Sequence, residues 1–155
     1  MKKLLLISLL LLSSAEDSYS RGLESAVDIS ASGMRAQSER IKVITENIAN
    51  SDTTGIDPND EPYRRKTIFF EEQKDERTGA SLVKVKKVSR DNSDFKLIYQ
   101  PNHPAANEEG YVKYPNVDRN LETMDLRDAQ RSYEANISAI ENTKQMKERT
   151  LDLMR

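Results

Sequence analysis

The 155-residue sequence contains no cysteine, no tryptophan and only one histidine, His103. The lack of cysteine excludes disulfides, thiolate metal sites and cysteine nucleophiles. His103 lies between prolines in "QPNHPAAN", and no second histidine or cysteine is available to share a metal ion with it. We therefore expect neither a metal site nor a cofactor in this chain.

Aromatic residues are also scarce, at 6% of the chain, whereas 32% of the residues are charged and 36% are hydrophobic. A chain with so few apolar side chains tends to bury them along helix seams or against partners, or to stay partly disordered. The net charge of −2 gives no indication of binding to nucleic acid or to an anionic membrane surface.

Catalytic motifs are missing as well. The sequence has no glycine-rich phosphate-binding loop, and Ser132 and Ser138 have no histidine near them in the sequence. Acidic pairs such as Glu108-Glu109 are better explained as solvated charges than as acid/base catalysts, because nothing marks a dry pocket around them. We expect a protein that is not an enzyme, with no catalytic residues and no small-molecule substrate.

The N-terminal stretch "MKKLLLISLLLLSSAED" has the pattern of a secretory signal. Lys2 and Lys3 precede an apolar run over residues 4–12, and Ser13 and Ala15 have the small-x-small spacing of a cleavage site. The run is too short to span a bilayer, which requires about 20 residues. We expect residues 1–15 to be a cleavable signal; the alternative is a retained helix start that packs on a partner.

The next segment, about residues 20–51, is predicted to form a long amphipathic helix that ends near Asn50. Gly33 interrupts the helix at a cost of about 1 kcal/mol, explained either by close approach of another chain or by a local kink. Residues 50–55 then supply helix-ending and turn residues. The seam has gaps of four and three, and six of its eight positions are apolar: Leu23, Val27, Ser30, Met34, Gln37, Ile41, Ile44 and Ile48.

The middle of the chain, residues 52–119, holds all five prolines and three of the five glycines. Three stretches within it favour strands: "RRKTIFFEEQ", "SLVKVKKVS" and "DFKLIYQ". Thr78-Gly79 is a plausible turn between the first two. We expect a small antiparallel sheet or hairpin that leans on the helices or on a neighbouring subunit, because two strands alone are marginally stable.

The last segment, residues 120–155, returns to a helical pattern, with Asn120 as the expected N-cap and Pro115 just upstream. Two successive gaps of four residues, through Ala129 and Tyr133, resemble a stutter. The seam continues to the end of the chain: Leu126, Ala129, Tyr133, Ile137, Ile140, Lys144, Lys147, Leu151 and Met154.

These patterns predict a mainly α protein with a small β insert (α+β). The two long terminal helices should pair, parallel or antiparallel, as a coiled-coil-like hairpin, because neither can bury its seam alone. Residues 20–51 and 120–155 would then form a discontinuous helical core, and residues 52–119 the β-rich insert. The seams explain either a hairpin that holds one monomer together or a self-assembling element.

A basic cluster stands out in the insert of this acidic chain. It is either a solvated strand face or an inter-subunit contact with acidic loops such as residues 57–61 or Glu108-Glu109, where charge would set the register. Its members are Arg64, Arg65, Lys66, Lys84, Lys86 and Lys87.

Four segments, in this order, resemble the flagellar axial proteins. "DISASGMRAQSERIKVITENIANSDTTG" resembles their N-terminal signature, "PYRRK" and "HPAANEEGYVKYPNV" resemble the proximal rod subclass, and "LRDAQRSYEANISAIENTKQM" resembles its C-terminal helix. The similarity covers about residues 28–155. The positions that match the motifs are Asn47, Ala49, Asn50, Gly55, Pro62, Tyr63, Arg64, Arg65, Pro104, Asn107, Gly110, Tyr111, Pro115, Arg131, Tyr133 and Asn136.

The resemblance implies a structural subunit of the basal-body rod, a periplasmic tube that transmits torque and passes export substrates. It implies terminal helices packed as the inner layer, and as partners other copies of the chain, other rod proteins, and ring and adaptor components. Members of this family start only a few residues before the segment matching Asp28 and leave by the flagellar type III apparatus. Here either Sec delivers the subunit, or the extension is retained, or the start is misassigned.

One alternative from another class fits the same seams. A secreted adaptor or chaperone could use the helical hairpin to bind a single client, and a complex of fixed stoichiometry would distinguish it from an open-ended assembly.

Overall fold

The computed structural model describes the backbone of residues 2–153 and the side chains of residues 21–152. The chain forms two long helices, α1 (Lys2–Ala49) and α2 (Arg119–Leu153), separated by four strands. The strands are β1 (Lys66–Lys74), β2 (Ser81–Arg90), β3 (Lys96–Tyr99) and β4 (Tyr111–Tyr114). This arrangement confirms the predicted mainly α fold with a β-containing insert.

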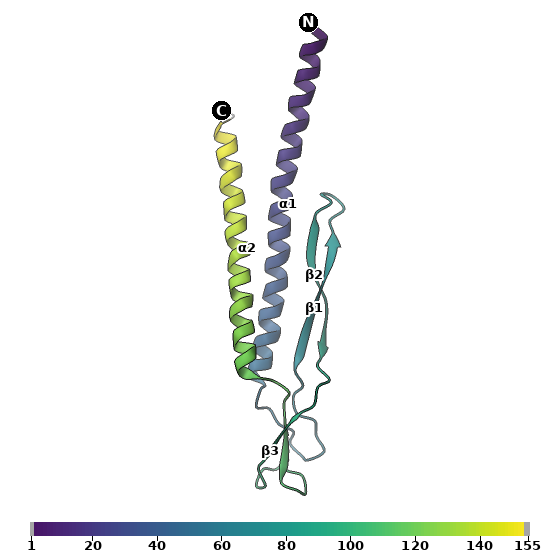
Figure 1. Ribbon diagram of the computed structural model, residues 1–155, viewed down its shortest axis with the longest axis vertical. Coiled ribbons are helices and arrows are strands. Elements are labelled where there is room, and N and C mark those ends of the chain that lie inside the picture. Colours follow the sequence, from purple (N-terminus) through teal and green to yellow (C-terminus); the bar gives the residue numbers. More distant parts are fainter. Residues whose placement is uncertain (1, 154–155) are drawn as a thin grey trace.

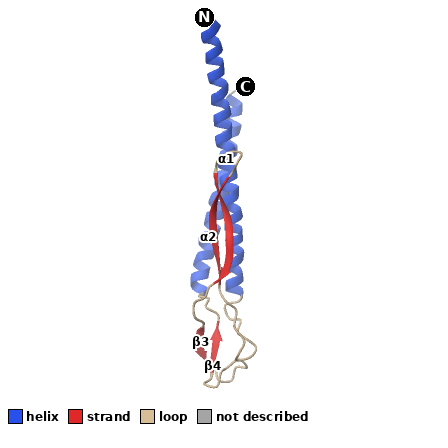
Figure 2. Cartoon of the chain, turned by 90° about the vertical axis from the view of Figure 1, so that its right-hand side faces the viewer, coloured by secondary structure: helices blue, strands red, loops and turns tan. Residues whose placement is uncertain are grey.

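The two helices run antiparallel, which settles the orientation that the sequence left open (Figure 1). Helix α1 lies between α2 on one side and the β1–β2 hairpin on the other, and it contacts both. Strands β3 and β4 lie beyond the helix pair, at the end of the molecule opposite to the chain termini (Figure 2). The molecule is therefore a rod with a small β-rich tip.

Apart from Asn47, the buried side chains in the described part of α1 are small or aliphatic, which lets neighbouring elements approach closely. Ser32 lies under the hairpin, where its Oγ donates to the carbonyl of Ile29 (2.7 Å) and accepts the amide of Val83 in β2 (3.1 Å). Among the α1 side chains that the structure describes, the buried ones are Ser30, Ser32, Ala36, Val43, Ile44 and Asn47.

Gly33 on α1 lies close to α2. A Cβ at this position would lie 2.8 Å from Oδ1 of Asn136 on α2, too close for an unstrained contact. The Asn136 amide donates to the carbonyl of Ser132 (2.8 Å), so its side chain is tethered to its own helix. The neighbour at Gly33 is therefore a side chain of the same chain, whereas the sequence left open close approach of another chain or a local kink.

Two helix boundaries differ from those expected. Helix α1 begins at Lys2 instead of near Ser20, so it continues through the predicted signal. The signal itself stays a prediction, because it depends on side chains outside those described.

The N-cap of α2 is Asp118, not Asn120. Asp118 Oδ1 accepts the amides of Asn120 (2.9 Å) and Leu121 (3.2 Å), and its carbonyl accepts the amide of Glu122 (2.9 Å). These backbone hydrogen bonds from Leu121 and Asn120 lower the pKa of the Asp118 carboxyl below its usual value. Asn120 therefore lies within the first turn of the helix.

The insert contains two separate two-stranded sheets. Strands β1 and β2 pair antiparallel, with a bulge where Phe69 and Phe70 face Lys87 and Val85. Their turn contains Gly79 with φ of +71°, in agreement with the predicted turn. Strand β3 pairs with β4, a strand that the sequence patterns did not indicate.

The turn of the β1–β2 hairpin is held on α1 by exposed ion pairs. Arg77 in the turn donates to Glu24 (3.0 Å) and Asp28 (2.7 Å). Exposed ion pairs of this kind contribute little stability but fix the position of the hairpin along the helix.

Among the described residues, no helix has the length and apolar character needed to cross a membrane.

Candidate functional site: a buried polar junction at the base of the helix pair

A buried asparagine joins three elements at the base of the rod. Asn47, in the last turn of α1, is 1% exposed. Its Oδ1 accepts hydrogen bonds from the hydroxyl of Tyr63 (2.9 Å) and the amide of Lys66 (2.8 Å). Its Nδ2 donates to the carbonyl of Lys66 (2.9 Å) and to Oε2 of Glu122 (3.1 Å). All four hydrogen bonds available to an amide side chain are thus made.

Glu122, in the first turn of α2, completes this junction. Its side chain is buried, yet it is a carboxylate, a group that is expensive to bury without partners. Arg65 supplies the compensating charge, with Nε donating to Glu122 Oε1 (2.6 Å) and a second ion pair to Asp91 (3.6 Å). We name Asn47, Tyr63, Arg65, Lys66 and Glu122 the polar junction.

A second layer of hydrogen bonds ties the insert to the polar junction. Asn116 Oδ1 accepts the amide of Arg65 (2.8 Å), and its Nδ2 donates to Asp91 O (3.1 Å) and Ser93 Oγ (2.8 Å). Arg64 donates to the carbonyls of Asp91 and Ser93 (both 3.1 Å), and its guanidinium lies 4.1 Å from the ring centroid of Phe95. The chain segments that precede β1 and follow β2 are therefore held together by hydrogen bonds.

The end of α1 is tied to the start of α2 on the other side. Arg119 donates to Ser51 Oγ (2.7 Å) and pairs with Asp52. Asn50 caps α1 locally, because both its backbone amide and its Nδ2 donate to the carbonyl of Glu46 (3.1 and 2.8 Å). A Cβ on Gly55 would lie 2.7 Å from Cβ of Asp60, so the loop that follows requires a glycine there.

Tyr63 carries the perturbed pKa of the junction. Burial, together with the charges of Glu46 and Glu122, raises its pKa from 10.0 to about 12. The neutral phenol is the form that donates to Asn47, so the fold favours the protonated state.

This shift predicts a pH effect of definite sign. Because the folded pKa lies above the unfolded value, the contribution of Tyr63 to stability is complete below pH 10.0 and is lost as the pH rises toward 12. In a titration followed by phenolate absorbance, one of the six tyrosines should ionise late. Tyr63→Phe should remove this late component and Tyr133→Phe should retain it; a late component that survives Tyr63→Phe would contradict the assignment.

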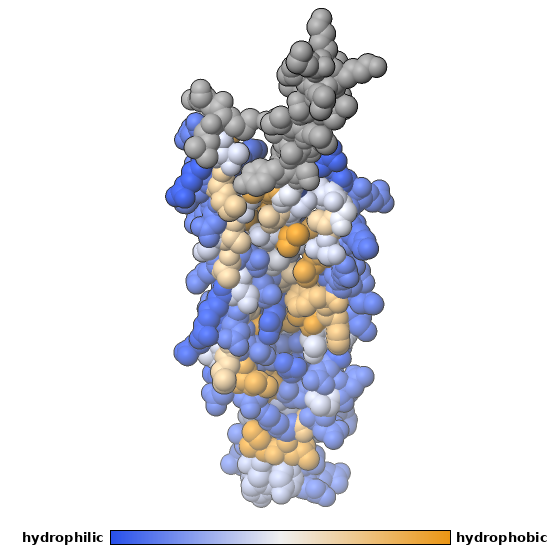
Figure 3. All heavy atoms as spheres, turned by 45° about the horizontal axis from the view of Figure 1, so that its top comes forward, coloured by the Kyte–Doolittle hydropathy of each residue, from blue (hydrophilic) through white to orange (hydrophobic). Residues whose placement is uncertain are grey.

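The predicted seam positions differ in how far the structure buries them. Ile44 and Ala129 are buried, whereas Leu151 is 56% exposed and Met154 lies outside the described residues. Figure 3 shows hydrophobic patches separated by hydrophilic side chains on the face that it presents. Of the polar seam positions, Ser30 is buried, Gln37 is half-buried, and Lys144 and Lys147 are exposed. The other apolar seam positions are half-buried: Leu23, Val27, Met34, Ile41, Ile48, Leu126, Tyr133, Ile137 and Ile140.

The structure divides the predicted basic cluster into two groups. Arg64 and Arg65 are engaged within the chain as described, and Lys66 pairs with Glu46, so these three cations already have partners within one copy of the chain. Lys84 and Lys87 are exposed on the outer part of the hairpin, with Lys87 lying 5.1 Å from the ring of Phe69. Lys86 is exposed too and pairs loosely with Glu71 (3.7 Å).

The remaining motif positions lie mainly in the tip. Asn107 Oδ1 accepts the amides of Glu109 (3.1 Å) and Tyr111 (2.8 Å), and Gly110 has φ of +84°. Tyr111 packs edge-on against Tyr99 at 5.3 Å. Of the other motif positions, Pro62 and Pro115 are buried, whereas Pro104 and Ala49 are exposed. Arg131 forms a surface ion pair with Asp128.

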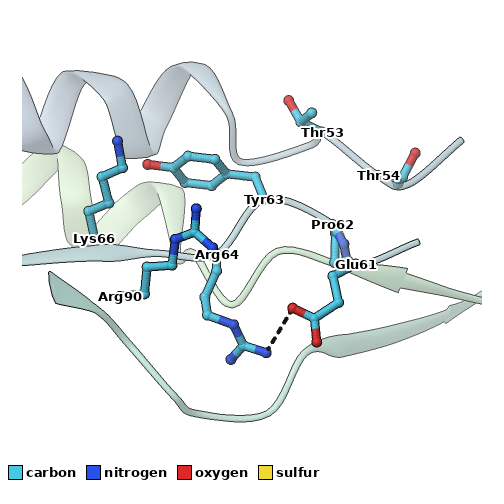
Figure 4. Close-up of a pocket in the computed structure, with 8 residues that line it drawn as sticks. All are labelled: Thr53, Thr54, Glu61, Pro62, Tyr63, Arg64, Lys66 and Arg90. Atoms are coloured by element: carbon cyan, nitrogen blue, oxygen red, sulfur yellow. Dashed lines mark ion pairs between the residues drawn. The ribbon is translucent and has the colours of Figure 1, made fainter. Parts of the chain in front are cut away.

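An open pocket adjoins the polar junction (Figure 4). Its volume is about 390 Å³. In Figure 4 the Arg90 side chain extends toward the ring of Tyr63, while the Arg64 side chain points the other way and pairs with Glu61. The pocket is lined by Thr53, Thr54, Glu61, Pro62, Tyr63, Arg64, Lys66 and Arg90.

Sequence reasoning missed four residues that organise this region. Glu122 looked like one of many helix-surface acids, and its seam offset from Leu126 was the only available signal. Ser32, Asn116 and Asp118 are short polar residues whose partners are distant in sequence or lie in a loop. Within the described residues, no group of three or more histidine, cysteine, aspartate or glutamate side chains is placed to hold a metal ion.

Comparisons with known proteins agree on one group. Residues 28–55 match the family model described as "Flagella basal body rod protein", and residues 108–153 match "Flagellar basal body rod FlgEFG protein C-terminal". A protein of Agrobacterium fabrum, "Flagellar basal-body rod protein FlgC", is 44% identical over 133 residues, covering 86% of this chain and 96% of that protein.

Relatives with the same name occur in distant bacteria. The Bacillus subtilis protein is 41% identical and covers 83% of this chain and 95% of its own length. The Aquifex aeolicus protein is 41% identical and covers 82% of this chain and 93% of its own length. The similarity therefore extends over both helices and the insert between them.

Proposed function

This chain belongs to the FlgC family of flagellar basal-body rod proteins, and we propose that its helix pair and its insert make different contacts within the rod. The protein is a structural subunit of the basal body, which spans the periplasm, and it serves motility without being an enzyme. As a rod protein it assembles with flagellar basal-body components. The surfaces that we propose for these contacts lie on α2 and on the β1–β2 hairpin.

The proposal is carried by apolar side chains that one monomer leaves uncovered along α2. Leu121, Met124 and Met146 are 52%, 64% and 50% exposed, as is much of Leu151. Side chains of this kind are stabilised by about 1.5–3 kcal/mol each when fully buried, so several of them together favour association. Contacts with other copies of the chain and with other rod proteins would bury them.

A contact between unlike surfaces of identical subunits generates a helical assembly when its rotation does not close. The rod-shaped fold has such unlike surfaces, because the helices form one side and the hairpin forms the other (Figure 2). We propose that Lys84, Lys86 and Lys87 on the hairpin set the register of this assembly through charge. Ring and adaptor components would surround the outer surface.

The decisive experiment locates the native chain. Deleting its gene should abolish motility and leave basal bodies without a complete rod, and the wild-type chain should be recovered in purified basal bodies. Recovery from the periplasm in a complex of fixed stoichiometry with one client would instead support the alternative of an adaptor or chaperone.

A further inference from the structure

The pocket beside the polar junction has an excess of positive charge. Arg64, Lys66 and Arg90 line it, and Glu61 is its one acidic lining residue. Glu61 pairs with Arg64 and Lys66 pairs with Glu46, so two of the three cations have partners within the chain. Among the described side chains, no carboxylate lies within ion-pair distance of Arg90.

The groups around Arg90 suit a carboxylate. The hydroxyls of Thr53 and Thr54 line the same pocket, and the Tyr63 ring forms part of its wall (Figure 4). The Arg90 guanidinium in this pocket can make charge-assisted hydrogen bonds to an incoming carboxylate. Arg90 is exposed, so an incoming acidic side chain could reach it without rearrangement of the fold.

The tip of the same molecule carries an acidic turn of matching chemistry. Glu108 and Glu109 are exposed, and within the described residues neither forms an ion pair. The turn is held rigid by Asn107, whose carbonyl accepts the amide of Gly110 (2.9 Å) and whose amide donates to the carbonyl of Tyr111 (2.9 Å). Two carboxylates are thus presented on a preorganised loop, which lowers the entropy lost on docking.

Gly110 makes this turn possible. Its φ of +84° is a conformation that other residues rarely adopt, and a Cβ there would lie 2.8 Å from the ring of Tyr99. Figure 1 places the loop between β3 and β4 at the end of the molecule opposite to the chain termini, where another subunit can reach it.

We propose that the acidic turn of one copy of this chain, Glu108-Glu109, docks into the Arg90 pocket of the next copy in the rod. The inference deepens the proposed function and depends on it. The turn and the pocket are different surfaces of the same chain, so the contact is heterologous and leaves a free turn and a free pocket at the ends of the assembly. Charge complementarity selects the second copy as the occupant.

Charge reversal with rescue tests this contact. Arg90→Glu alone, or Glu108→Lys with Glu109→Lys, should place like charges together and lower the number of complete rods at least about tenfold. Combining all three changes should restore it to within about twofold, because the opposite charges meet again. The matched control is Lys74→Glu, which reverses the charge of an exposed lysine at the end of the β1–β2 hairpin opposite to Arg90. This variant should leave the number of rods unchanged.

Disulfide trapping gives an independent readout. Because the chain has no cysteine, Arg90→Cys and Glu109→Cys introduce the only thiols. When the two single variants are expressed together, a crosslinked dimer should form in the oxidising periplasm, and it should be absent when either is expressed alone. Circular dichroism of each purified variant checks that the helices are retained.

The outcomes separate the proposal from the function on which it rests. Complete rods in the reversed variants, without a crosslink, would overturn the contact while leaving the rod function intact. Loss of rods that the combined variant does not restore would assign the pocket to a different protein and overturn the second copy as its occupant. Absence of the wild-type chain from basal bodies would refute the proposed function itself.

Discussion

Replacing Ile44 by aspartate is expected to abolish motility and the formation of a complete rod. The Ile44 side chain is 5% exposed and belongs to the buried core of the molecule. The substitution loses about 1.5–3 kcal/mol of apolar burial and places an unpaired charge in a dry environment, which adds further cost. A total loss of about 4 kcal/mol or more is among the largest effects of a single substitution.

The matched control is Ser38→Asp, which adds the same charge to an exposed position of the same helix. Urea unfolding followed by circular dichroism should give a large decrease in the free energy of unfolding for Ile44→Asp and less than about 0.5 kcal/mol for Ser38→Asp. Normal swimming and complete rods in the Ile44→Asp strain would show that this part of the seam is not needed for assembly.

Replacing Glu122 by alanine is expected to have the second large effect. The change removes the buried acceptor of both Arg65 Nε (2.6 Å) and Asn47 Nδ2 (3.1 Å) and leaves the guanidinium with only its longer ion pair to Asp91. Breaking a fully buried pair from one side costs about 3–5 kcal/mol. The loss here should be about 3 kcal/mol, at the lower end of that range, because Arg65 keeps its ion pair with Asp91 and its side chain is 24% exposed. The connection between the helix pair and the hairpin should loosen as well.

Two further variants identify the cause of this effect. Glu122→Gln keeps an acceptor and the side-chain volume but loses the charge, so its free energy of unfolding should fall between those of wild type and Glu122→Ala. Glu134→Ala removes an exposed carboxylate from the same helix and should change little. Hydrogen exchange at the base of β1 should increase in Glu122→Ala; unchanged exchange together with unchanged stability would contradict the role given to the junction.

The polar junction contributes less net stability to the fold than the cost of removing one of its members suggests. A buried ion pair is often no more stabilising than well-packed apolar residues of the same volume. Its hydrogen bonds are directional, however, and those of Asn47 and Glu122 reach three elements at once. We therefore interpret the junction as the device that fixes the angle between the helix pair and the insert, which a regular assembly requires.

Several parts of the fold were predictable because their causes are local. The seven-residue spacing of apolar side chains determines two long helices, and the residues after Asn50 cannot continue the first one. Gly79 supplies the positive φ that the hairpin turn needs. The β4 strand was missed because four residues, "YVKY", carry too short a pattern, and because its pairing with β3 is decided by closure of the loop between them.

The candidate site was only partly predictable for the same reason. The resemblance of "PYRRK" and of the Asn47 segment to rod proteins selected residues that do meet in the junction, but it assigned no partners to them. Glu122 and Arg65 are 57 positions apart in the chain, and the identity of a buried partner at that separation leaves no local pattern. The N-cap of α2 was also not determined by local sequence. Asp118 and Asn120 are both residues that cap helices well, and the geometry of the preceding loop selects Asp118.

The sequence by itself determined the two amphipathic helices, the position of the insert and membership of the rod family, because periodicity and short motifs are properties of neighbouring residues. Only the tertiary structure decided that the helices run antiparallel, that α1 is covered on both sides, and that Arg65 is neutralised within the chain while Arg90 pairs with no carboxylate among the side chains that the structure describes. These outcomes depend on which distant groups share a buried space, and that is set by the packing of the whole chain.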